Sequence, residues 1–151
     1  MRELETATDP LLAALELPRE GPRVVAIGGG HGLAQGLKAI TRYAGRIAAI
    51  VTSADDGGSS GRLAPLLGIP PPGDLRRCLV ALTPQDSPLR RLFEHRFGDG
   101  DLAGHSLGNL MIASLAVSEG GIVPGLRAAG RLLGAVGSAL PAASEPLRLT
   151  A

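Results

Sequence analysis

The chain has 151 residues, a formal net charge of +1 and a single cysteine. This length suits one domain with a sizeable core, and the balanced charge gives no electrostatic reason to expect a nucleic acid or a membrane surface as partner. Cys78 alone excludes an intrachain disulfide and a zinc site built from several cysteines. No stretch approaches the ~20 apolar residues of a membrane span, and Met1 to Glu5 precede no signal-type apolar run, so we expect a cytoplasmic protein.

Residues 1–22 are interpreted as an extension that precedes the folded domain, which we expect over residues 23–151. A short helix is predicted for residues 9–17, because Asp9 is a good N-cap and Pro10 suits the first turn. A proline-containing stretch then breaks the chain before the first strand. No function is assigned to the extension.

The first strand and the glycine turn that follows it organise the predicted fold. Val24–Ile27 is an unbroken apolar run, typical of a buried parallel strand, and the spacing of Leu33 and Leu37 predicts a helix that begins just after Gly32. Glycine permits positive φ, and the free amides and dipole of a helix N-terminus favour an anion. The turn is therefore predicted to bind phosphate, the alternative being a tight turn that binds nothing. Its residues are Gly28, Gly29, Gly30, His31 and Gly32.

This turn matches neither of two common phosphate loops. The dinucleotide fingerprint Gly-x-Gly-x-x-Gly fails because Leu33 stands at its third glycine. The P-loop pattern fails because Leu37, and not lysine, follows Gly36. The sequence therefore indicates a nucleotide-type turn of another family.

A second buried strand is predicted at residues 47–52, and with the preceding helix it forms a βαβ unit, which favours a parallel sheet. The loop over residues 54–62 then opens onto the same crevice as the glycine turn, since ligands of open α/β sheets bind beyond the carboxyl ends of the strands. The adjacent carboxylates of this loop can accept hydrogen bonds from ribose hydroxyls or base N–H groups, or bind a metal ion, and its serines and arginine can donate to an anionic oxygen. The alternative is a solvated turn without a ligand. These residues are Asp55, Asp56, Ser59, Ser60 and Arg62. Residues 63–67 allow one helical turn.

A further helix is predicted over residues 75–82, with Asp74 as its N-cap. Arg76 and Arg77 fall in its first turn, where the helix dipole disfavours cations. They indicate an acidic partner, which is either a ligand phosphate or a protein carboxylate such as Asp74 or Asp55.

The segment Gly104–Gly108 fits the Gly-x-Ser-x-Gly nucleophile elbow of α/β-hydrolases. An elbow serine follows a buried strand and precedes the acid and the histidine of the triad. Here the preceding residues are charged and glycine-rich, and no histidine follows Ser106. We therefore predict a helix N-terminus with Ser106 as N-cap, so that His105 and Asn109 lie near a second helix end that suits an anion.

Two more helices are predicted over residues 87–97 and 124–136, and a last strand at residues 147–149. Cys78 is expected in the core and His95 on the surface or in packing. The inward residues of the last helix are predicted to be Leu126, Ala129, Leu132 and Leu133.

Four segments, in this order, carry a family resemblance. They are Val24–Leu33, Ala54–Leu63, Pro71–Arg76 and Ala103–Leu110, of which the second is long and specific. The sequence closely resembles the YvcK-type proteins, the gluconeogenesis factors that bind UDP-N-acetylglucosamine, which are related to the CofD phospholactate transferases of deazaflavin coenzyme synthesis. The resemblance spans about residues 23–150 and implies a Rossmann-like α/β fold, a parallel sheet with flanking helices.

The resemblance also implies a nucleotide site at the strand ends. We predict a site that includes the glycine turn, the acidic loop and two later helix ends, with no catalytic residue. Its residues are Gly28, Gly29, Gly30, His31, Gly32, Asp55, Asp56, Ser59, Ser60, Arg62, Asp74, Arg76, His105 and Asn109. Asp55 and Asp56 could bind a divalent metal ion beside the nucleotide, and no other cofactor is expected.

What is known of the family implies a regulator of cell-wall peptidoglycan precursors, cell shape and growth on gluconeogenic carbon. We expect its ligand to be UDP-N-acetylglucosamine or a related nucleotide. His31 resembles actinobacterial variants, whereas Arg77 replaces an asparagine of many relatives. Family members are longer than this chain, which we expect to form their N-terminal half and to expose a sheet edge that invites a homo-oligomer or another partner.

Two alternatives stay open at this point. The first is a CofD-like phospholactate transferase that uses a nucleotide-activated substrate and a metal held by Asp55 and Asp56. The second is a truncated, non-catalytic interaction fragment. Metal-dependent turnover favours the first, and a monomer that binds no ligand favours the second.

Overall fold

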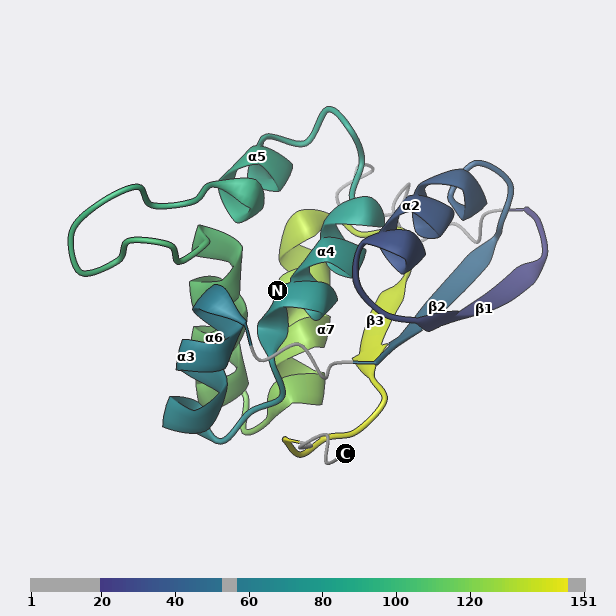
Figure 1. Ribbon diagram of the computed structural model, residues 1–151. Helices are drawn as coiled ribbons and strands as arrows, with labels where there is room; N and C mark the ends of the chain where they lie inside the picture. The colour runs from purple at the N-terminus through teal and green to yellow at the C-terminus, as the bar shows by residue number, and fades with distance from the viewer. Residues whose placement is uncertain (1–19, 53–56, 147–151) are drawn as a thin grey trace, which may run out of the picture.

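The computed structural model describes residues 20–52 and 57–146 (Figure 1). Within these ranges three parallel strands pair in the order β1-β2-β3, and they span Arg23–Gly28, Arg46–Val51 and Ser138–Pro141. The helices of the same ranges are α2 (Gly30–Ile40), α3 (Gly58–Leu67), α4 (Pro72–Ala81), α5 (Pro88–Glu94), α6 (Leu107–Ser118) and α7 (Ile122–Leu133). The predicted α/β class and parallel, Rossmann-like sheet are confirmed.

One face of the sheet packs against α2, α4 and α7 (Figure 1). In the register of the strands, Ala26 lies beside Ala49 and Ala49 beside Ala139, and the last two are buried in the core. Residues next to these along a strand point to the opposite face. On that opposite face Val25 and Ile27 are 62% and 71% exposed, so the described residues leave this side of β1 open.

The first two helices begin earlier than the sequence indicated. Helix α2 begins at Gly30, and not after Gly32, because Gly30 adopts the left-handed φ of +59° and lets the chain turn directly out of β1. Residues 58–62, predicted as loop, form the first half of α3. Within this helical turn Ser59 and Ser60 are buried, and the Ser59 Oγ has a fixed hydrogen-bond donor in Asn109 Nδ2, as buried polar groups require.

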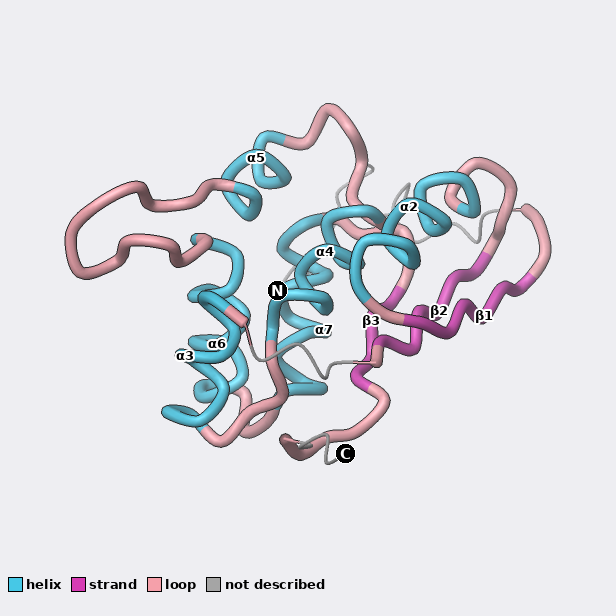
Figure 2. Tube along the Cα trace, viewed as in Figure 1, coloured by secondary structure: helices cyan, strands magenta, loops and turns pink. Residues whose placement is uncertain are grey.

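Helix α4 begins at Pro72, so Asp74 is not the N-cap and lies within the first turn. Proline is favoured at the first helical position, and this moves the helix start ahead of the aspartate. Helix α5 ends at Glu94 rather than near Phe97, because the chain after it pairs with the segment before α6. The N–H of Phe97 donates to the carbonyl oxygen of His105 at 2.9 Å. The connection between α5 and α6 extends away from the sheet (Figure 2).

In the C-terminal part of the chain the predicted cap of α6 is confirmed, whereas the bounds of α7 and the position of the last strand differ from the prediction. Ser106 caps α6, since its Oγ accepts from the Asn109 N–H at 3.2 Å. Helix α7 runs over residues 122–133 rather than 124–136, and Leu132, predicted inward, is 46% exposed because it falls outside the buried stripe of its helix. Strand β3 at residues 138–141 was not predicted. The predicted strand at 147–149 and the predicted helix at 9–17 lie outside the described residues.

The core between the sheet and the helices is aliphatic, and it contains Cys78, as predicted. Cys78 is fully buried, and burial raises the pKa of its thiol to about 12, so the side chain is an inert hydrophobe at neutral pH. In the part of the chain that the structure describes, the helices are too short or too polar to cross a membrane.

Candidate functional site

Contacts between neighbouring helix starts connect the N-terminal ends of α2, α4, α3 and α6 in turn, and the first of them, α2, directly follows β1. The Gly30 N–H of α2 donates to Asp74 Oδ2 of α4 at 2.9 Å. A Cβ on Gly73 would stand 2.5 Å from a serine oxygen of α3, and Asn109 Nδ2 of α6 donates to Ser59 Oγ of α3 at 3.0 Å. Because helix N-termini carry unpaired amides and the positive end of the dipole, this region suits an anion.

Asp74 places a buried carboxylate among these helix ends. One oxygen accepts from the Gly30 N–H, and the other accepts from Arg77, one turn along the same helix. Of the two acidic partners that the sequence left open for the arginines, a ligand phosphate and a protein carboxylate, Arg77 has the carboxylate of Asp74. Since Asp74 already satisfies the Gly30 amide, it occupies one of the anion-binding positions at the start of α2.

A chain of directed hydrogen bonds connects α4, α6, α3 and the segment before α6. Arg76 Nε donates to Asn109 Oδ1 at 3.0 Å, and Asn109 Nδ2 donates to Ser59 Oγ at 3.0 Å. Ser59 Oγ lies 3.0 Å from His105 Nδ1. A hydroxyl has one proton and two lone pairs, so Ser59 accepts from Asn109 and either donates to His105 Nδ1 or accepts from its Nδ1–H, according to the tautomer of the ring. All four side chains are buried.

The electrostatics agree with a neutral histidine beside a permanent cation. Burial lowers the pKa of His105, and the charges of Arg62 and Arg96 lower it further. Burial also lowers the pKa of Arg76 to about 10, with Arg77 and Arg96 adding to the effect, so Arg76 is still charged at neutral pH. The region therefore holds a desolvated positive charge and an uncharged imidazole.

The remaining predicted residues are less closely joined to this network. His31 is exposed on the first turn of α2, where its Nε2 lies 3.2 Å from Gln35 Nε2. Arg62 is exposed and donates to the carbonyl oxygen of Ala103 at 2.6 Å, which fastens the loop before α6. Ser60 is buried at the start of α3.

Asp55 and Asp56, the predicted metal ligands, lie outside the described residues. Over residues 20–52 and 57–146 no group of three histidine, cysteine, aspartate or glutamate side chains is placed to hold a metal ion. The metal at Asp55 and Asp56 therefore stays a prediction.

Two contacts at the site were not found from the sequence. Thr52 directly follows β2, and its N–H donates to the Gly28 carbonyl oxygen at 2.8 Å. A Cβ on Gly29 would stand 2.5 Å from Thr52 Oγ1, so the turn after β1 and the end of β2 are in close contact. The signal for Thr52 is its place directly after a predicted strand, at the edge where ligands of such sheets bind. Gly73 had no comparable signal, because its close approach to Ser60 depends on how α3 packs.

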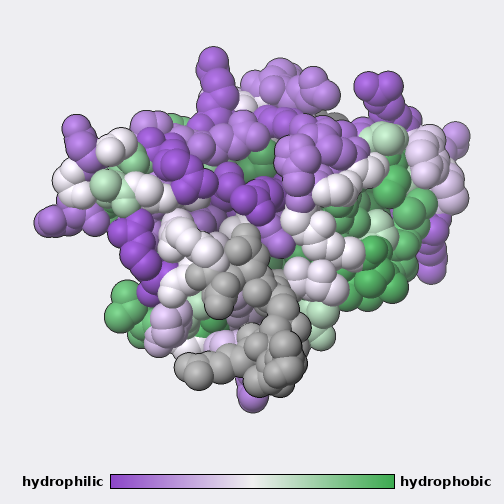
Figure 3. Space-filling view, viewed as in Figure 1, coloured by the Kyte–Doolittle hydropathy of each residue, from purple (hydrophilic) through white to green (hydrophobic). Residues whose placement is uncertain are grey.

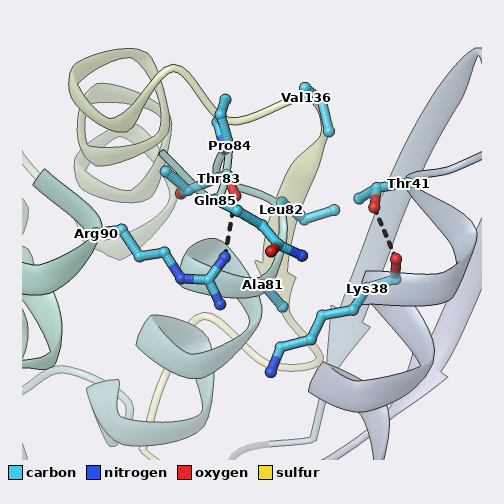
Figure 4. A pocket seen from close by; sticks show the side chains of 9 residues that line it. All are labelled: Lys38, Thr41, Ala81, Leu82, Thr83, Pro84, Gln85, Arg90 and Val136. Carbon is cyan, nitrogen blue, oxygen red and sulfur yellow. Dashed lines mark hydrogen bonds between the residues drawn. The ribbon is translucent and has the colours of Figure 1, made fainter. Parts of the chain in front are cut away.

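A pocket of about 200 Å³ lies at the opposite ends of α2 and α4 (Figure 4). Lys38 and Arg90 line it, and Arg90 donates to the carbonyl oxygen of Thr83 at 3.4 Å. Helix C-termini carry the negative end of the dipole, so they favour these cations and disfavour an anionic ligand. None of the predicted site residues lines this pocket, and we assign the candidate site to the helix N-termini instead.

Comparison with known families matches residues 24–151 to the family described as 2-phospho-L-lactate transferase CofD. A protein of Nostoc sp. is 45% identical over 148 residues, which make up 97% of this chain and 32% of that protein. The gluconeogenesis factor of Halalkalibacterium halodurans is 46% identical over 127 residues, 83% of this chain and 39% of that protein.

The fold recurs in a solved structure. The crystal structure of a UPF0052 family protein from Bacillus halodurans superposes with a TM-score of 0.80 at 44% identity. The superposition covers 85% of this chain and 41% of that chain. The chain thus spans about a third to two fifths of the length of the proteins that it matches.

Proposed function

The chain belongs to the CofD family, and from this membership and the geometry of its helix ends we propose that it binds a nucleotide sugar as a regulator. The observation that carries the proposal is the meeting of four helix N-termini beyond the end of a parallel sheet, where nucleotides bind in open α/β folds. The name gluconeogenesis factor, carried by the Halalkalibacterium relative, supports a regulatory role in carbon metabolism. We take UDP-N-acetylglucosamine as the ligand and control of cell-wall precursors and cell shape as the outcome.

Each part of the ligand has a proposed partner. The diphosphate meets the amides of the Gly28–Gly32 turn, apart from the Gly30 N–H that Asp74 occupies. Arg76 supplies positive charge from the buried side of the site, where low polarity strengthens its attraction for phosphate. Asp55 and Asp56 bind the ribose, the base or a metal ion beside the phosphates.

Isothermal titration of the chain with UDP-N-acetylglucosamine tests this proposal. We expect saturable binding that Asp56→Ala weakens by about tenfold or more, because hydrogen bonds to a charged group contribute roughly 1.5–3 kcal/mol. Asp101→Ala is the matched control, since this exposed carboxylate lies in the loop between α5 and α6 and keeps the affinity unchanged. Absence of heat with both this chain and the full-length Halalkalibacterium relative, or equal affinities of Asp56→Ala and Asp101→Ala, refutes the proposal.

The description of the matched family favours a second candidate, transfer of a phospholactate group. In that case Asp55 and Asp56 hold a divalent metal that neutralises phosphate charge during transfer. Incubation with Mg²⁺, a nucleotide-activated phospholactate and an alcohol acceptor distinguishes the candidates, because transfer of phospholactate to the acceptor hydroxyl breaks the phosphoanhydride bond and releases the nucleoside monophosphate. Saturable binding of the nucleotide sugar without such turnover supports the regulator.

A further inference from the structure

Two cations face each other across the pocket at the C-terminal ends of α2 and α4. Lys38 extends into it from α2 and Arg90 from α5, and the two side chains point toward one another (Figure 4). No aspartate or glutamate lines the pocket, and within the described part of the chain neither cation forms an ion pair with a carboxylate. Because like charges repel, an acidic group between the two cations would stabilise this arrangement.

The pocket combines this positive rim with an apolar lining. Ala81, Leu82 and Val136 contribute the apolar part, and hydrophilic side chains surround the region along the upper edge of the molecule in Figure 3. The helix ends offset the rim only in part, because a helix C-terminus carries about half a negative charge, whereas Lys38 and Arg90 each carry a full positive charge. The remaining charge suits a single carboxylate but not a diphosphate. An acidic segment with apolar side chains therefore fits the pocket.

The N-terminal extension joins the fold beside this pocket. The N–H of Gly45 donates to the Pro22 carbonyl oxygen at 3.0 Å, and a Cβ on Gly21 would collide with the Tyr43 carbonyl oxygen. These contacts closely follow Thr41, which lines the pocket at the end of α2. Since each residue of an extended chain spans up to ~3.3–3.6 Å, the chain that precedes the described residues starts within reach of the pocket.

Residues 1–19, which precede the described ranges, have the acidic and apolar side chains that suit this pocket. Four of them are acidic and two are arginines. In the helix predicted for residues 9–17, spacings of three and four residues place Leu11, Leu12 and Leu15 on one face. Glu16 follows Leu12 by four residues and so borders this face. Most of the extension also falls within the match to the Nostoc protein, which covers 97% of this chain.

We propose that this extension, residues 1–19 of the same chain, docks into the pocket between the C-terminal ends of α2 and α4. Its leucine face covers the apolar lining, and Glu16 lies between Lys38 and Arg90. The occupant follows from the charge of the extension and from the place where it joins the fold. Docking holds together the far ends of α2 and α4, two helices that begin at the candidate site, and it does not depend on the proposed ligand.

Carbodiimide cross-linking of the whole chain, followed by mass spectrometry of its peptides, tests this contact. Lys38 is the only lysine of the sequence, so apart from the N-terminal amine it is the one amine that can be joined to a carboxylate. Because a carbodiimide adds no spacer, it joins only groups that are in contact. We expect a cross-link between Glu16 and Lys38, and we expect Lys38→Arg to abolish it, since arginine keeps the charge but does not react.

Two substitutions that add the same charge to the extension locate the contact. Leu15→Asp is expected to lower the yield of cross-links from residues 1–19 to Lys38 by about tenfold or more, since it places a charge in the apolar contact. Ala13→Asp is the matched control, because residue 13 falls on the opposite face of the predicted helix and leaves the yield unchanged. Circular dichroism and urea unfolding verify that both variants keep the fold of the unmodified chain.

A mixture of chains grown on light and heavy nitrogen isotopes identifies the occupant. Docking within one chain gives cross-links between peptides of the same label at every protein concentration. Cross-links between peptides of different label overturn the proposal, because they make a second copy the occupant. The absence of any cross-link from residues 1–19 to Lys38 also overturns it, as do equal yields in Leu15→Asp and Ala13→Asp.

Discussion

Helices α2 and α4 have polar groups at both of their ends, but the two ends satisfy them differently. At the N-terminal ends Arg76 and Asn109 are buried and bonded to each other. At the C-terminal ends Lys38 and Arg90 line an open pocket of about 200 Å³. Burial of a cation among neutral side chains costs free energy of folding, because the charge loses its hydration, whereas a cation near a helix C-terminus is stabilised by the helix dipole. The cations at the open pocket are therefore favourable where they lie, whereas the buried network is costly, and this contrast supports our choice of the helix N-termini as the candidate site.

The largest difference between the two ends is expected from loss of a buried polar side chain. Asn109→Ala removes the acceptor of the buried Arg76 Nε and one of the two partners of Ser59 Oγ, and together these losses are expected to destabilise the fold by about 3 kcal/mol. Thr83→Val at the other end removes one bond, from Thr83 Oγ1 to the Leu79 carbonyl oxygen, and is expected to cost about 1 kcal/mol. Urea unfolding measures both free energies.

Asn109 and Thr83 are 2% and 3% exposed, so burial does not distinguish them. Equal losses for the two variants would mean that the network contributes no more than a single helix bond. Asn109→Asp extends the comparison, because a carboxylate keeps the acceptor for Arg76 but loses the amide donor to Ser59.

The second test concerns the start of α2 itself. Gly30 has a φ of +59°, and an alanine in the left-handed region costs about 1–2 kcal/mol. Gly36→Ala on the same helix is expected to stabilise the fold by roughly 0.5–1 kcal/mol, because an alanine favours the helix and Gly36 is exposed with open space around its Cβ position. Thermal unfolding of the two variants at one pH checks the contrast. A Gly30→Ala protein as stable as Gly36→Ala would show that the strained turn relaxes freely.

The third test uses pH, to which the network responds through His105. Burial and two arginines lower the pKa of His105 in the folded chain below its usual value of 6.5. At a pH below 6.5 the unfolded chain therefore binds a proton at His105 more readily than the folded chain does. Stability due to the neutral ring is therefore full above about pH 7 and is lost as the pH falls toward 5. Urea midpoints between pH 7.5 and about 5 are expected to decrease, and less so in His105→Gln.

His31→Gln is the matched control, because this ring is exposed on α2. A pH slope that His105→Gln keeps and His31→Gln removes would contradict the neutral, network-bound state of His105.

The sequence predicts two of the three described strands, but not the packing of the helices at the candidate site. The apolar runs of β1 and β2 and the Ser106 cap are local signals, and the structure confirms them. The sequence predicts Ser59 in a loop that suits an anionic oxygen, and only the packing of α3 against α6 reveals it as a buried helical residue. Strand β3 was missed because four residues that end in proline carry little pattern. The sequence predicts Asp74 as a cap, whereas its actual partner, the Gly30 N–H, is 44 residues away and carries no local signal.

The smallest effect is expected at the pocket between the C-terminal ends of α2 and α4. Lys38 lies in the last turn of α2, where its charge interacts favourably with the dipole, so Lys38→Ala costs about 0.3–0.5 kcal/mol. Because this pocket lies at the far ends of the helices from Gly30 and Asp74, the affinity for UDP-N-acetylglucosamine is expected to stay within about twofold of the unmodified chain. Titration of Lys38→Ala beside Asn109→Ala separates the two ends directly. A tenfold loss for the lysine variant, with binding intact in the asparagine variant, would move the ligand to the open pocket, where the field of two helix C-termini opposes an anion.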